Sequence, residues 1–337
     1  MRFEQLGVGV LRVDNIIGAG APVEMGIGEK YYVDGVNGSN GNSGKTPGTA
    51  LSTPAAGYSA LTASQNDRLL LMPSTYTLTE TLTWAKAQTH MIGIGNPTWR
   101  QGGKIRLQTT VEAATATVDV TASGVFFGGF NITQNGAFTA CVTALRLSST
   151  YFSAEQLDLR GHLQATVAAT EAASSLEFAA AGNGFASTFM DCNIGTGSGS
   201  ARSCASAEDG NGVINFAGTA SGPGYVEFHD CRILSRSSTV YPVMVRAVVP
   251  NSFDRYVLFK DSLFHNFYLH QTDKLDAAFR LKQAAGGSSY FMLKNCMAGG
   301  IDQWQIQDQA QPTVLSDMPI VGTGGGLGLQ PTGAAGA

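Results

Sequence analysis

The chain carries little charge. Charged residues make up 14% of its 337 positions, against roughly 25% in an average globular protein. Helices covered with surface ion pairs are therefore not expected. No basic stripe or polybasic run is present, and the formal net charge is −4. Neither a nucleic acid nor a membrane surface is an expected partner.

Signals for export and for membrane insertion are also missing. The stretch at 1–20 lacks a basic region followed by a continuous apolar block, so a secretory signal is not expected. Residues 120–145 carry no charge, but Asn, Gln, Thr and Gly interrupt them too often for a membrane span.

Five cysteines at no zinc-like spacing favour a reducing compartment over a disulfide framework. The five histidines are scattered, so we predict no metal site and no cofactor.

Glycine, by contrast, is abundant at 42 residues, and one short motif recurs. The motif places an apolar residue at its first and sixth positions, as in "FMDCNI" and "FHDCRI". Irregular spacing of the copies by tens of residues is typical of a solenoid, because insertions fall in loops. The copies begin at Phe127, Phe152, Phe189, Phe228, Phe259 and, in a weaker form, Leu293.

The middle of the motif indicates a bend. Positions one and six of a straight strand point to opposite faces, so both can face a core only if the chain turns between them. Asp and Asn tolerate the left-handed backbone of a sharp corner. We therefore interpret the third position as a turn ladder, although a repeated catalytic acid remains an alternative. The predicted ladder is Asp191, Asp230, Asp261 and Asn295, with Gly129 and Ala154 in the earlier copies.

The residue after each corner is expected to point inward, which makes Cys192, Cys231 and Cys296 a column of small core plugs. Each copy is also preceded by a β-rich segment, such as "TVDV", "ALRL", "SLEF", "VINF", "VMVR" and "AFRL". Three strands per repeat without an intervening helix predict an all-β fold, a right-handed single-stranded parallel β-helix. We assign it to residues 67–305.

The stretch at 31–66 resembles the N-terminal module of pectate-lyase-like β-helix proteins. Its strand "YYVDG" precedes a Gly/Asn-rich loop and a short helix, which Thr53 and Pro54 would begin. "DRLLLMPSTYTLTETLTW" at 67–84 is similar to the first coil of that family, and "HMIGIG" to the next. The loop at 34–44 does not match an EF-hand calcium site, so we interpret it as a plain turn. The resemblance implies a fold shared by lyases, hydrolases, phage tailspikes and virion surface proteins, and a homotrimer as the assembly.

A hydrolytic site needs two carboxylates about 5–9 Å apart, one with a raised pKa. No two carboxylates at the strand positions predicted to face outward form a clear pair. The remaining weak candidates for catalytic residues are Glu208 and Asp209. These two acids lie in one of several insertions that could gather on one face and contact a partner or a glycan. The other candidates on these partner-facing loops are Arg202, Arg236, Tyr241, His265, Tyr268 and His270.

The ends of the chain differ from its middle. Residues 1–30 are apolar and rich in glycine, so we expect them to cap the first coil or to dock onto another virion protein, such as the major capsid protein. Residues 306–337 read as a flexible tail or one ordered by assembly.

Three functions follow from these observations. The first is a non-enzymatic phage-like virion protein, assembled in the host cytoplasm, which most resembles a capsid decoration or cement protein. The alternative is a tailspike or free enzyme that degrades a polysaccharide by hydrolysis or elimination. A bacterial surface adhesin is third, disfavoured by the missing export signal.

Overall fold

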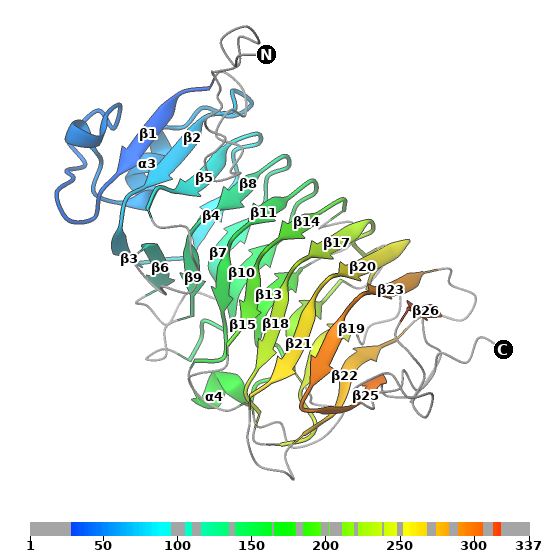
Figure 1. The fold of residues 1–337 in the computed structure, drawn as a ribbon. Helices are drawn as coiled ribbons and strands as arrows, with labels where there is room; N and C mark the ends of the chain where they lie inside the picture. The colour runs from blue at the N-terminus through cyan, green and yellow to red at the C-terminus, as the bar shows by residue number, and fades with distance from the viewer. Residues whose placement is uncertain are drawn as a thin grey trace, which may run out of the picture.

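The protein is a right-handed parallel β-helix, in which three long sheets run the length of the molecule (Figure 1). The structure is a computed structural model. It describes residues 28–95, 105–109, 116–134, 139–163, 165–179, 185–196, 202, 211–218, 222–237, 239–247, 252–267, 274–282, 289–305 and 313–317. Each coil contributes one strand to each sheet, and all strand pairs are parallel, as in the pairing of β14 with β17. The fold predicted from the repeat is confirmed.

We name the sheets in the order in which a coil visits them. Sheet I has ten strands: β1 (Lys30–Val33), β2 (Arg68–Leu71), β5 (His90–Gly93), β8 (Phe126–Gly128), β11 (Ser153–Glu155), β14 (Thr188–Met190), β17 (Val226–His229), β20 (Tyr256–Lys260), β23 (Tyr290–Lys294) and β26 (Thr313–Ser316). Sheet II has eight: β3 (Ser74–Leu78), β6 (Ile105–Thr109), β9 (Asn131–Thr133), β12 (Asp158–Arg160), β15 (Asn193–Gly195), β18 (Arg232–Ser235), β21 (Leu263–Asn266) and β24 (Met297–Gly299).

Sheet III also has eight strands: β4 (Leu82–Trp84), β7 (Ala116–Val120), β10 (Thr143–Leu147), β13 (Ser174–Phe178), β16 (Gly212–Phe216), β19 (Val243–Ala247), β22 (Leu275–Leu281) and β25 (Ile301–Gln305). The β-rich segments predicted to precede the motif, from "TVDV" to "AFRL", form β7 to β22 of this sheet. Strand β26 lies in the segment predicted to be a tail, where no further strand was expected.

The core is a column of stacked side chains inside the three sheets. Phe189, Phe228 and Phe259 occupy the same position in successive coils and are fully buried. Their ring centroids are 4.8 and 4.4 Å apart, with the ring planes nearly parallel. In-register strands about 4.8 Å apart bring like side chains together, so one apolar residue per coil builds a continuous stack. This stack fixes the register on which the outer surface depends.

A second ladder of equivalent residues lies on sheet II. Asp158 is buried, and its Oδ2 and Oδ1 atoms accept hydrogen bonds from Asn131 and Asn193 on the two neighbouring coils, both at 2.8 Å. Arg160 donates to the same carboxylate at 2.7 Å. Because a buried carboxylate is costly unless its oxygens are bonded, this acid serves the fold.

The first coil is closed by the segment between β1 and β2. Leu51 donates its backbone N–H to Tyr32, and Tyr32 donates to Gly44, so this segment covers the edge of β1. It contains the 3₁₀ helix η1 (Pro47–Thr49) and the helix α3 (Pro54–Ala60). Thr53 caps α3 and Pro54 begins it, as predicted. Most of the segment predicted to cap or dock, residues 1–27, lies outside the described residues.

Candidate functional site

The outer face of sheet I presents its side chains in straight columns. In the sheet I strands β11, β14, β17, β20 and β23 the last residue points outward, and these residues form what we call the outer column. They are Glu155, Met190, His229, Lys260 and Lys294. The next residue of each coil makes the turn into sheet II, and these residues form the corner column: Gly129, Gln156, Asp191, Asp230, Asp261 and Asn295.

Every member of the corner column has a left-handed backbone. The φ angles of Asp191, Asp230, Asp261 and Asn295 lie between 47° and 53°. One corner was wrongly predicted. Ala154 pairs with Phe127 and Phe189 and is buried in β11, whereas Gln156 has the left-handed φ of 53°.

Because the corner was placed at Ala154, Glu155 was not recognised as an outward-facing acid. With the motif placed at Phe152, Glu155 falls on the inward position of the cysteines. In the actual register it belongs to the outer column, because it pairs with Met190. The signal was present in "LDL" at 157–159, which matches the apolar–polar–apolar "CNI" at 192–194. Counting from that triplet, rather than from the phenylalanine, aligns the coils correctly.

Glu155 lies beside Asp191 on the neighbouring coil. Gln156 donates its N–H to the carbonyl of Met190 at 3.0 Å, which brings the two acid-bearing corners together. The partly buried position of Glu155 raises its pKa, and the charge of Asp191 raises it further. Asp191 is itself held by Arg232 of the following coil, with Nη1 and Oδ1 3.3 Å apart. The pair thus consists of an acid with a raised pKa and a carboxylate paired with a cation.

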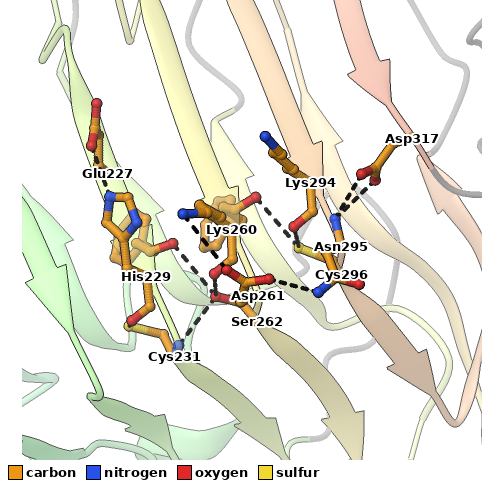
Figure 2. A network of polar contacts seen from close by, with 12 residues as sticks. Glu227, His229, Cys231, Lys260, Asp261, Ser262, Lys294, Asn295, Cys296 and Asp317 are labelled. Atoms are coloured by element: carbon orange, nitrogen blue, oxygen red, sulfur yellow. Dashed lines mark hydrogen bonds and ion pairs between the residues drawn. The ribbon is translucent and has the colours of Figure 1, made fainter.

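A second polar group follows on the next two coils (Figure 2). His229 Nε2 lies 2.8 Å from Oε2 of Glu227, and the hydroxyl of Tyr256 donates to Oε1 of the same carboxylate at 2.6 Å. The hydrogen bonds from Tyr256 and His229 lower the pKa of Glu227 against the opposing effect of burial. The ring of His229 is therefore oriented next to Lys260, its neighbour in the outer column.

Beyond these residues the corner column forms a shallow cavity of about 330 Å³. Asn295 donates its side-chain amide to Asp261 at 2.6 Å, and its backbone N–H to the carboxylate of Asp317 at 2.8 Å. The cavity lining includes Asp230, Arg232, Asp261, Asn295 and Met297. Polar groups that both donate and accept suit a polyhydroxylated ligand.

The cysteines next to the corners take no part in this surface. Cys192, Cys231 and Cys296 are buried and point into the core. Burial raises the pKa of Cys296 to about 11, and burial beside Cys192 raises the pKa of Cys231. Because the thiolate is the nucleophile, Cys231 and Cys296 are unreactive at neutral pH.

The predicted loop face is only partly described. Glu208, Asp209, Tyr268 and His270 lie outside the described residues. Arg202 is a correction: it is 2% exposed, and its guanidinium donates to Asn211, Ser235 and the carbonyl of Val243, so it joins two coils and is not available to a partner. A further correction concerns His265, which belongs to β21 and not to a loop.

Arg236 and Tyr241 are half-buried beside β18 and β19. Within the residues that the structure describes, no three His, Cys, Asp or Glu side chains come together as metal ligands. No helix in the described part of the chain is long and apolar enough to cross a membrane.

No protein-family model matches the sequence, and no curated protein matches it either. Solved structures do. The pectate lyase Pel9A superposes with a TM-score of 0.57 at 15% identity, over 92% of this chain and 74% of that one. A pectin methylesterase in complex with a hexasaccharide superposes with a TM-score of 0.51 at 14% identity, over 82% of this chain and 81% of that one. The chain has the β-helix fold of these pectin-acting proteins. At such identities the likeness concerns the fold alone.

Proposed function

We propose that this protein hydrolyses a polysaccharide on the outer face of sheet I, with Glu155 as general acid and Asp191 as the second carboxylate. The observation that carries the proposal is the position of these two acids on neighbouring coils, with the pKa of Glu155 raised and Asp191 held by Arg232. Two carboxylates in unlike environments are what glycoside hydrolysis requires. Glu208 and Asp209 are not needed for it.

In the reaction, Glu155 donates its proton to the glycosidic oxygen while the bond from that oxygen to the sugar carbon breaks. Asp191 follows Met190, the register partner of Glu155, by one residue, so the two acids lie on neighbouring coils and in adjacent columns. Asp191 would attack the sugar carbon as the nucleophile, the role of the second carboxylate in glycosidases that retain configuration. Glu155, now ionised, then takes a proton from the water that releases the sugar.

The fold favours action on a polysaccharide over a purely structural role. Both solved structures described above belong to proteins named for action on pectin, a polysaccharide. The scaffold alone does not decide the chemistry, so the proposal depends on Glu155 and Asp191. The predicted homotrimer, the docking onto capsid protein and the place on a virion stay predictions, and a host glycan would be one source of the substrate.

The test is the release of reducing ends from a panel of polysaccharides by the full chain. We expect hydrolysis with retention of the anomeric configuration. Replacing the acid by its amide in Glu155→Gln lowers the rate by roughly 10²–10⁴-fold, the usual contribution of a general acid. The matched control is Glu177→Gln on sheet III, which leaves the rate per folded molecule unchanged. Unsaturated sugar ends, or full activity of the Glu155→Gln variant, would contradict the proposal.

A further inference from the structure

One aromatic residue per coil lies at the start of the sheet I strands. Tyr225 and Tyr256 precede the paired residues Val226 and Val257, and Tyr256 pairs with Tyr290. Tyr151 precedes β11, where its N–H donates to the carbonyl of Phe185 on the next coil. We call this set the aromatic column: Tyr151, Phe185, Tyr225, Tyr256 and Tyr290.

The rings of the aromatic column form a continuous strip over four coils. The centroid distances are 6.1 Å from Tyr151 to Phe185, 5.1 Å from Phe185 to Tyr225, and 5.3 Å from Tyr225 to Tyr256. Each successive pair meets edge to face. The two ends of the aromatic column are open to solvent, since Tyr151 is 57% and Tyr290 44% exposed, and the three rings between them are partly exposed. Exposed aromatic rings at this density mark a binding surface.

The strip is joined to the polar columns beside it. The hydroxyl of Tyr256 donates to Glu227 at 2.6 Å, so the ring is anchored and loses little freedom when a ligand binds. Arg255 lies over the ring of Tyr225, with its hydroxyl 3.2 Å from Nη1. Leu258 and Met292, also on the outer face, lie in register between the aromatic and outer columns. The face therefore combines apolar rings with hydrogen-bonding groups.

The proposed catalytic pair lies at one end of this strip. Glu155 and Asp191 belong to the coils of Tyr151 and Phe185. Towards the N-terminus the strip stops, because the position equivalent to Tyr151 is Gly124. Towards the C-terminus it continues over the next two coils to Tyr256, and Tyr290 lies in register on the coil after them. A ligand that spans the strip and reaches the catalytic pair must run along the axis of the β-helix, across the strands.

The charges along the face favour a neutral ligand. Most cations along the face are paired with its own acids: Arg232 with Asp191, Lys260 with Asp261, and Arg255 with Asp254. Such a surface offers a polyanion no excess of positive charge. Carboxylates and lysines accept from and donate to hydroxyl groups equally well.

We infer that the aromatic column binds a linear, uncharged polysaccharide lengthwise, with sugar rings stacked along Tyr225, Tyr256 and Tyr290 on one side of the cleavage point. This inference rests on the proposed function for the place of cleavage, and it names the substrate class. The coil spacing of about 4.8 Å is comparable to the length of one sugar unit. Each further coil can therefore accept roughly one further sugar.

Binding can be tested without turnover. The full chain with Glu155→Gln is titrated calorimetrically with ladders from disaccharide to octasaccharide. The neutral probes are cello-, malto- and manno-oligosaccharides, and oligogalacturonides are the acidic probe. We expect the affinity for one neutral ladder to rise with length until the strip is filled. Tyr290→Ala should weaken binding of the longer members roughly 2- to 10-fold, the usual effect of one stacked ring. Tyr225→Ala should weaken the shorter members as well.

The control is Phe267→Ala, which removes a ring of similar exposure (41%) that follows β21 of sheet II. The Phe267→Ala variant should bind every oligosaccharide series as tightly as the chain without that substitution does. Failure of every neutral ladder to bind, tighter binding of oligogalacturonides, or unchanged affinity in both tyrosine variants would overturn the inference. Tyrosine-dependent binding by an unsubstituted chain that releases no reducing ends would refute only the hydrolysis.

Discussion

The outer faces of sheets I and III both carry a column of charged residues in register, yet the two columns differ in what surrounds them. The sheet III column holds Arg246 and Arg280 at 7% and 2% exposure. Its charges are paired: Arg146 lies 3.1 Å from Glu177, and Arg246 contacts Glu171. The full column is Asp119, Arg146, Glu177, Asn215, Arg246 and Arg280.

Glu155 and Glu177 show what the difference means. Burial raises the pKa of both. For Glu177 the charge of Asp119 adds to that rise, but the charge of Arg146 and a hydrogen bond from Thr143 oppose it. For Glu155 the neighbouring charge is the carboxylate of Asp191, which adds to the rise. The same in-register arrangement therefore pairs Glu177 with a cation on sheet III and leaves Glu155 beside another acid on sheet I.

The sharpest way to break this comparison is to remove one arginine from each face. Arg232→Met frees the carboxylate of Asp191 from its ion pair. Because misplacing a reacting group by about 1 Å can cost 10²-fold, we expect hydrolysis to fall by roughly 10–100-fold. Steady-state kinetics should place the loss in kcat and leave KM nearly unchanged. Since the pair is exposed, the free energy of unfolding should change by less than about 1 kcal/mol. An equal loss of stability and activity would show that Arg232 is structural.

The matched change on sheet III is Arg246→Met, and it should affect stability only. Arg246 is buried and leaves Glu171 unpaired when it is removed, so the free energy of unfolding should fall by about 2–3 kcal/mol, below the range for a fully buried pair. Urea unfolding measures this loss. The kcat of the folded fraction should equal that of the unsubstituted chain. A stable Arg246→Met variant would mean that the two columns do not differ in role.

A smaller effect is expected at the corners that separate sheet I from sheet II. Asp230 has a φ of 53°, so Asp230→Ala should cost roughly 1 kcal/mol of stability through the left-handed backbone. Asp230→Gly should recover most of that loss, because glycine adopts this conformation without strain. Thermal unfolding of the two variants distinguishes the cases. Equal destabilisation by alanine and glycine would assign the effect to the carboxylate and not to the backbone.

The smallest effect is a dependence of stability on pH. The pKa of Glu155 is raised in the folded chain above its ordinary value of 4.5, so its contribution to stability is complete below that pH and is lost as the pH rises through the folded-state value. Glu155→Gln cannot ionise. Its melting temperature should therefore exceed that of the unsubstituted chain slightly at neutral pH, and the two should converge below about pH 4.5. A lower melting temperature of Glu155→Gln than of the unsubstituted chain at neutral pH would show that folding stabilises the carboxylate.

Much of this architecture could be predicted because it repeats. Phenylalanine at one position and Asp or Asn two residues later appear in three or more coils, so the corners at Asp191, Asp230, Asp261 and Asn295 could be assigned from sequence alone. The coil at 152–160 lacks both signals. Its inward residue is Ala154, where other coils have a large apolar residue, and its corner residue is Gln156, where other coils have Asp, Asn or Gly. The motif was therefore placed two residues too early in this coil.

The candidate site was harder to predict because it is built between coils. Glu155 and Asp191 are 36 positions apart, and only the exact register of β11 with β14 brings them together. The same holds for Glu227 and Tyr256, which meet across two coils. The corner acids were interpreted as turn residues and not as catalytic acids, because a turn explained their spacing. A left-handed corner and an exposed carboxylate are compatible, and Asp191 is both.

The aromatic column also implies that the length of the substrate-binding surface can change independently of the chemistry. Each coil from β17 to β23 brings its own strand, its own corner and its own ring, and touches only its two neighbours. Duplicating the coil of β20 would lengthen the surface by one sugar-sized step and leave Glu155 and Asp191 where they are. Deleting it would shorten the surface by the same step. In such a molecule, a change of gene length by one repeat becomes a change in the preferred length of the ligand.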